Sequence, residues 1–157
     1  MTDDAFMAMA IERAREGMNS GGSPFGACIV AADGRVIACE HNVVWQTTDA
    51  TAHAEVNAIR VACRAVSGIK LEGATIYSST EPCPMCFSAI HWAGMRRIVY
   101  GASIADAARA GFSELSISNF DMKRLGGSPV EIVSGVMAEE AKELFERWLA
   151  DPKRRVY

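Results

Sequence analysis

Two short patterns in the sequence combine the residue types that bind zinc. They are H-A-E at residues 53–55 and P-C-P-M-C at residues 82–86. Cys83 and Cys86 lie three positions apart at the predicted start of a helix, so their thiols fall on one face. A helix N-terminus favours the thiolate, the form that binds metal. His53 also lies at a predicted helix start. We therefore expect one nitrogen and two sulfurs around one zinc ion, with the fourth position open as in catalytic sites.

Glu55 is the residue expected to transfer protons at this site. It follows His53 by two positions, so we expect it to reach the open position without binding the metal. A carboxylate there can take a proton from water, deliver it to a ring nitrogen and then protonate leaving ammonia. The combination H-x-E…P-C-x-x-C is the signature of zinc deaminases. A lone C-x-x-C is often a structural zinc half-site or a redox pair, but no second C-x-x-C is available to complete one.

The other histidines and cysteines have simpler interpretations. His41 and His91 stand alone in the sequence and are interpreted as structural or exposed. Three cysteines occur in apolar runs and are expected to pack in the core: Cys28, Cys39 and Cys63. The chain has five cysteines and no export signal at its start. These features predict a reducing compartment, a cytoplasmic location and no disulfide framework.

Helices and strands alternate along the chain that positions these residues. Helices are predicted for residues 3–19, 52–66 and about 80–94, with a last helix whose apolar stripe is Ala141, Leu144, Phe145, Trp148 and Leu149. Strands are predicted for residues 25–30 and 35–40 around an Asp33-Gly34 turn, and for residues 74–78, 97–100 and 130–133. Residues 42–51 are predicted as a loop, and residues 103–128 as a short helix and then a loop. This order predicts a three-layer α/β/α sandwich, with a mixed five-stranded sheet between helices.

Length and charge narrow the possible partners. The 157 residues predict one domain, 1–157, with a C-terminal tail from about residue 152. No apolar run approaches the roughly 18 residues that span a bilayer. The net charge is −3 and the isoelectric point about 5.6, which argues against a nucleic-acid-binding surface. The only basic cluster, at residues 153–155, is too small to change that interpretation.

Over nearly its whole length the chain resembles the cytidine and deoxycytidylate deaminase superfamily, and within it the bacterial guanine deaminases. The zinc motifs carry the resemblance to the superfamily, in TAHAEVNAIR and STEPCPMCFSAIHWA. The resemblance to guanine deaminases rests on GGSPFGACIV, on Asn42, on GASIADAARAGF and on a short tail ending at Tyr157. The GASIADAARAGF segment differs from its counterpart in tRNA adenosine deaminases.

The resemblance implies a role for each matching position. His53, Cys83 and Cys86 would bind one Zn²⁺ per chain, and Glu55 would be the catalytic proton shuttle. The substrate-binding residues would be Asn42, Phe25, Ala54, Trp92, Glu114 and Tyr157. Glu114 stands where the guanine deaminases have an aspartate, and is one methylene longer. Tyr157 would close the pocket, in this family as part of a tail from the partner subunit, so a homodimer with exchanged tails is one expectation.

Five of these residues also have ordinary structural interpretations. Asn42 could cap a turn at the end of a strand. Phe25 and Trp92 could be core residues. Glu114 could be a solvated acid, and Tyr157 a frayed end.

The function that follows from the resemblance is hydrolytic deamination of guanine to xanthine and ammonia. Deamination of adenosine in tRNA is the main alternative, because tRNA adenosine deaminases share the TAHAE and EPC-x-MC patterns. Guanosine, cytosine and amino-triazines are further possible substrates. A zinc- or RNA-binding module without catalysis is the alternative from another class, but such a module has no need to retain Glu55.

Overall fold

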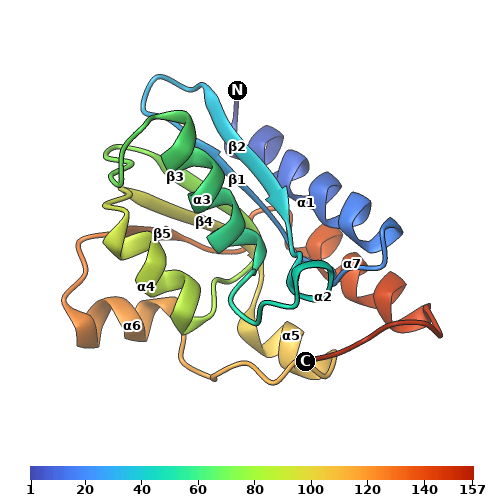
Figure 1. Ribbon diagram of the computed structural model, residues 1–157. Coiled ribbons are helices and arrows are strands. Elements are labelled where there is room, and N and C mark those ends of the chain that lie inside the picture. Colours follow the sequence, from blue (N-terminus) through green and yellow to red (C-terminus); the bar gives the residue numbers. More distant parts are fainter.

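The computed structural model describes all residues, 1–157, and contains one mixed five-stranded sheet in the order β2-β1-β3-β4-β5 (Figure 1). The strands are β1 (Gly26–Val30), β2 (Val36–His41), β3 (Thr75–Thr80), β4 (Arg97–Ala102) and β5 (Glu131–Val133). Strand β1 is antiparallel to both β2 and β3, whereas β3, β4 and β5 are parallel to one another. Parallel neighbours need crossover connections, and helices provide them here.

Helices cover both faces of this sheet. Helices α1 (Asp3–Asn19) and α7 (Ala138–Ala150) pack against each other, α1 on strands β1 to β4 and α7 on β4. Helix α3 (Ala54–Ala65) packs on β1 and β2 and beside α4 (Pro84–Trp92), which in turn contacts α6 (Asn119–Gly126). Figure 1 shows α3 and α4 in front of the sheet and α1 and α7 on the other side. The predicted three-layer α/β/α sandwich is confirmed. None of the helices combines the length and apolar composition needed to cross a bilayer.

The structure differs from the expected elements in two loops. Helix α2 (Val44–Thr47) lies within the predicted loop 42–51, and α6 lies within residues that were expected to form a loop. Helix α5 (Ile104–Arg109) is the short helix that was expected. Local chemistry explains α6. The Ser118 hydroxyl accepts a hydrogen bond from the Asp121 N–H at 3.1 Å, and Gly127 ends the helix at a φ of 68°.

Helix α3 buries a single face against the sheet. The buried residues are Ala54, Glu55, Ala58 and Ala62, at helical spacing. The small side chains of the three alanines let α3 lie close to β1 and β2. This close packing carries Glu55 into the interior.

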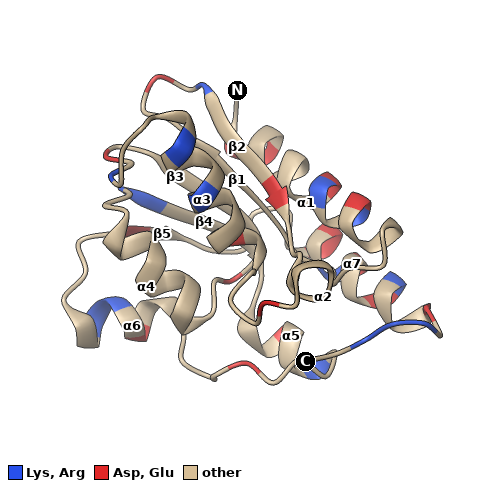
Figure 2. Cartoon of the chain, viewed as in Figure 1, with Lys and Arg blue, Asp and Glu red and all other residues tan.

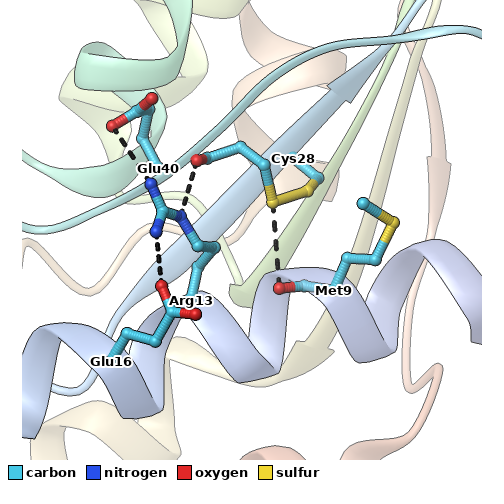
Figure 3. The surroundings of a disulfide bond; sticks show 6 residues. Met9, Arg13, Glu16, Cys28 and Glu40 are labelled. Atoms are coloured by element: carbon cyan, nitrogen blue, oxygen red, sulfur yellow. Dashed lines mark hydrogen bonds and ion pairs between the residues drawn. A yellow bond between two sulfur atoms is a disulfide. The ribbon is translucent and has the colours of Figure 1, made fainter.

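Cys28 and Cys39 correct the expectation that the chain has no disulfide. They are directly opposite each other in the antiparallel β1–β2 pair, with Cα atoms 4.1 Å apart, and they form a disulfide (Figure 3). Such cross-strand neighbours are close enough for a bond only because the hairpin sets this register. Beside the disulfide, the Arg13 Nε of α1 donates a hydrogen bond to the Cys39 carbonyl at 2.7 Å. Cys63 remains a free, half-buried thiol.

Candidate active site

Three side chains from two helix starts converge at one point. His53 is the residue before α3, and Cys83 the residue before α4, where it is followed by Cys86 in the first turn. The His53 Nδ1 lies 3.6 Å from the Cys83 Sγ and 3.6 Å from the Cys86 Sγ. All three ligand atoms lie within 4.8 Å of one another. The structure thus brings together the three residues that the sequence marked as metal ligands.

These distances fit tetrahedral zinc. With Zn–N of about 2.0–2.1 Å and Zn–S of about 2.3 Å, two tetrahedral ligands N and S lie about 3.5–3.6 Å apart. One imidazole and two thiols are also a donor set that zinc prefers over calcium or magnesium. The cluster contains no fourth His, Cys, Asp or Glu ligand. The residues therefore fit a zinc ion with one position left for water or substrate.

Hydrogen bonding in the cluster gives Cys83 the character of a thiolate. The Cys86 thiol and His53 lower the pKa of Cys83 to about 4, although burial acts in the opposite direction. The same bond to Cys83, together with burial and nearby Glu55, raises the pKa of Cys86. Desolvation opposes the charged form of His53, but the bond to Cys83 and the charges of Glu55, Cys83 and Glu114 together outweigh it and raise the pKa of His53. One thiolate is thus already formed for metal binding.

Glu55 lies beside the cluster in the protein interior. Its side chain is 6% exposed, with Oε2 3.4 Å from the Cys86 Sγ. Burial, followed by the charge of Cys83, raises the pKa of Glu55. Its Oε1 lies 3.0 Å from the hydroxyl of Ser78 on β3, a residue that sequence reasoning missed. A carboxyl group with a raised pKa, held next to the open position, has the properties of a general acid–base.

A cavity of about 190 Å³ opens beside His53 and Cys83. Its other walls include Met85, Glu114 and Tyr157. This volume is below the roughly 300–1,000 Å³ of pockets for drug-sized ligands, so it suits a small molecule. The Glu114 Oε2 is buried and has no hydrogen-bond partner in the protein. Burial, and then the charges of Cys83 and Glu55, raise the pKa of Glu114 to about 8.

The C-terminal tail turns back from α7 and ends beside α5 (Figure 1). Its last residue, Tyr157, lines the cavity. The Asn42 amide nitrogen donates to the Tyr157 hydroxyl at 2.5 Å, and the Ser113 N–H donates to the Tyr157 carbonyl at 3.2 Å. The Tyr157 ring lies 5.6 Å from the His53 ring. Tyr157 is therefore fixed rather than frayed, and within the single chain it lies beside the metal-ligand cluster.

Asn42 and Ala54 are both fully buried, each next to or bonded to a residue that lines the cavity. Asn42 is fully buried, and its Oδ1 accepts a hydrogen bond from the Val44 N–H at 3.1 Å. This bond is the turn cap that the sequence allowed. The Asn42 amide nitrogen has two hydrogens and gives one to Tyr157, so a second remains. Ala54 is the first residue of α3, where the backbone N–H has no acceptor within the helix.

The structure does not bring Phe25 and Trp92 to the cavity. Phe25 packs in the core against Phe112 and Phe145, with ring centroids 4.8 and 5.8 Å away. Trp92 is 76% exposed. It ends α4, nine residues after Cys83, and at a rise of about 1.5 Å per residue this places it about 13 Å along the helix axis. Neither residue lines the cavity of the single chain, and their assignment as pocket walls stays a prediction.

Aromatic residues that sequence reasoning missed support the tail. The Phe112 ring lies 5.4 Å from that of Tyr157, and the Trp45 ring 6.5 Å from it. Trp45 Nε1 also donates to the Arg155 carbonyl at 3.3 Å. No local pattern marks these contacts, because they join residues about 45 to 110 positions apart.

The family model for the cytidine and deoxycytidylate deaminase zinc-binding region matches residues 1–102. The chain belongs to this family. It is therefore a hydrolytic deaminase by family. Guanine deaminase of Bacillus subtilis is 47% identical over 115 residues, which are 73% of each chain. The tRNA-specific adenosine deaminase of Agrobacterium fabrum is 35% identical over 148 residues, or 94% of each chain.

Solved structures of similar proteins agree with the fold. A guanine deaminase from Nitrosomonas europaea has a TM-score of 0.87 at 27% identity, covering 94% of this chain and 85% of the other. A structure in complex with 2,6-diaminopurine has a TM-score of 0.90 at 28% identity, covering 96% of this chain and 83% of the other. Both relatives have the mixed sheet and flanking helices of this deaminase fold.

Proposed function

We propose that this deaminase acts on the free base guanine and converts it to xanthine and ammonia, with one zinc ion per chain. The observation that carries the proposal is Glu114. Its carboxyl oxygen is buried at the cavity without a protein partner. A buried acceptor without a partner favours a ligand that supplies N–H donors and disfavours one that leaves it unpaired. The N–H edge of guanine supplies such donors, whereas adenine and cytosine present different edges.

Metal binding and proton transfer are carried out by different residues of the site. His53, Cys83 and Cys86 would hold zinc, which when bound supplies Lewis-acid activation of water. Glu55 takes a proton from the attacking water and passes it to the ring nitrogen next to carbon 2. It then takes the remaining proton of the hydroxyl group added at carbon 2 and delivers it to the amino group, which leaves as ammonia while the carbonyl forms. Burial raises the pKa of Glu55, so its carboxyl group holds a proton more readily than an exposed one, as a general acid–base requires.

The base is held by groups around the cavity. Glu114 accepts hydrogen bonds from its N–H edge, while the remaining Asn42 N–H and the Ala54 backbone N–H donate to its acceptors. Tyr157 covers the base and excludes water, which strengthens these polar contacts. Closure within one chain is supported by the bonds that join Tyr157 to Asn42 and Ser113.

Deamination of adenosine in tRNA is the second candidate, because the Agrobacterium fabrum relative matches 94% of the chain. Two observations favour a free base instead. Tyr157 covers the cavity, so a base attached to a polynucleotide needs the tail to move. The net charge is −3, and Figure 2 shows basic residues interspersed with acidic ones along α1, with a basic run in the tail. Binding an RNA backbone needs an extended cationic surface.

We also propose a homodimer as the assembled form. Exposed apolar side chains gather at the end of α4 and along α6: Trp92, Phe120 and Leu125. Contiguous exposed apolar residues mark interaction surfaces. Light scattering should give twice the chain mass, and Trp92→Ser with Leu125→Ser should shift it toward one chain.

The experiment that tests the substrate assignment measures ammonia release by zinc-loaded protein. The panel is guanine, guanosine, adenine, cytosine and a tRNA anticodon stem-loop containing adenosine. Guanine should be deaminated with the highest kcat/KM, and Glu55→Gln is the control for contaminating activity. A higher kcat/KM on the stem-loop would replace the proposal with the second candidate.

A further inference from the structure

Glu81 is a buried glutamate that the deamination chemistry does not use. It follows β3 immediately and precedes the P-C-P-M-C motif, and its side chain is 5% exposed. Its Oε2 accepts a hydrogen bond from the Ile104 N–H at 3.0 Å, and its Oε1 accepts one from the Asn119 N–H at 2.8 Å. One carboxyl group therefore joins two backbone positions that lie 15 residues apart.

Both partners of Glu81 are the first residues of helices. Ile104 begins α5 and Asn119 begins α6. The backbone N–H at such a position has no acceptor within its own helix, so Glu81 supplies the acceptor for two helices at once. The chain between these helices contains Ser113, Glu114 and Leu115, which form one wall of the cavity. Glu81 thus holds both ends of the segment that carries Glu114.

Glu81 and Asn119 also fix this segment to the metal-ligand loop. The Glu81 N–H donates to the Ala102 carbonyl at 2.7 Å, so the glutamate itself is anchored at the end of β4. The Asn119 side chain is fully buried, and its Nδ2 donates to the Pro82 carbonyl at 2.6 Å. Pro82 is the residue next to Cys83. The start of α6 is therefore tied directly to the backbone that presents a metal ligand.

We propose that Glu81 is a positioning residue that, with Asn119, sets the distance between the metal-ligand loop and Glu114. Neither residue touches the cavity. Their effect passes through the backbone of residues 104–119, whose first and last residues both bond to Glu81. The proposal rests on the proposed function only in the part of it that uses Glu114 as a substrate contact.

Glu81→Gln tests this role with little change in volume. The glutamine amide nitrogen cannot accept a hydrogen bond, so one of the two backbone N–H groups then faces another donor. We expect amide hydrogen exchange at Ile104 and Asn119 to become at least tenfold faster in the zinc-loaded protein without substrate. KM for guanine should rise at least tenfold with kcat changed less than threefold, because ground-state and transition-state contacts to Glu114 are lost together.

Tyr77→Phe is the matched control. It removes one partly buried hydrogen bond, from the Tyr77 hydroxyl to the Asp3 Oδ1 at 2.8 Å, near the other end of β3. We expect it to lower Tm while exchange in residues 104–119 and KM stay at the wild-type values. If Glu81→Gln behaves like this control, with a lower Tm but unchanged exchange and KM, Glu81 has a structural role only and the proposal is wrong.

The wild-type protein gives an independent test if Glu81→Gln does not fold. The second amides of the two helices, at Ala105 and Phe120, also lack an acceptor within their helix, but they belong to exposed residues and have no Glu81 contact. Exchange measured by NMR should be at least a hundredfold slower at Ile104 and Asn119 than at Ala105 and Phe120, and equal rates would overturn the proposal. If guanine is not a substrate, KM is measured on the base that is deaminated. The exchange measurements need no substrate, so the two failures are distinguishable.

Discussion

Binding of guanine should be coupled to loss of a proton from Glu114. Burial first, and then the charges of Cys83 and Glu55, raise the pKa of this side chain to about 8. At pH 7 only about one in eleven molecules therefore carries an ionised Glu114, and ionising the rest costs about 1.4 kcal/mol. Only the carboxylate offers acceptors on both oxygens to the N–H edge of a base.

The direction and size of the change in KM with pH follow from the ionisation equilibrium of Glu114. The ionised fraction rises from about 9% at pH 7 to about 76% at pH 8.5, so KM for guanine should fall about eightfold over that range. The assay is steady-state ammonia release at several pH values, with zinc content checked at each. A KM that is constant from pH 7 to pH 8.5 would refute the reasoning.

Two variants of Glu114 distinguish the effect of its charge on KM from the effect of its size. Glu114→Gln keeps the size but loses the titration, so its KM should not vary with pH. At pH 8.5 its KM should exceed that of the wild type by about 10- to 150-fold, the equivalent of losing about 1.5–3 kcal/mol for a hydrogen bond to a charged group. Glu114→Asp retains the charge and should retain the pH dependence. If KM of Glu114→Gln depends on pH as in the wild type, the group that titrates is not Glu114.

Four further outcomes test the site and the fold. Glu55→Gln should lower kcat by about 10²–10⁴ or more without changing zinc content, since the amide cannot carry a proton; near-normal turnover would mean another shuttle. Cys86→Ala should lose zinc, measured by elemental analysis, and should lower Tm, because metal binding is linked to folding. Deleting residues 154–157 should lower guanine turnover at least tenfold with zinc content unchanged, and a parental rate would make the tail dispensable. Arg97 lowers the pKa of Asp3 through hydrogen bonds of 2.9 and 2.8 Å. The ionised Asp3 therefore stabilises the folded state fully above the ordinary Asp pKa, and this stabilisation is lost as the pH falls through the lowered pKa. Asp3→Asn should therefore reduce the free energy of unfolding by about 1 kcal/mol at pH 7, measured in urea, with the difference from wild type narrowing below about pH 4.

The sequence determined the metal-ligand cluster and the layer architecture. Cys83 and Cys86 are three residues apart at a helix start, so local helix geometry alone sets them on one face. The alternation of strands and helices predicted a sandwich because each element must bury an apolar face against another. The second helix of residues 103–128 could also have been found, since Ser118, Asp121 and Gly127 are ordinary signals for a cap and a helix end.

Only the tertiary structure decided how the cavity is built around that cluster. Trp92 shares a helix with the ligands yet lies at its far end, whereas Tyr157 is 104 residues from His53 and lies 5.6 Å from its ring. The Cys28–Cys39 bond depends on the register of a hairpin, and the two contacts of Glu81 depend on where two later helices begin. Which residues share a face of one helix or strand is fixed by the repeat of that element and can therefore be predicted from the sequence. Contacts between distant segments depend on the path of the whole chain, and no local pattern encodes that path.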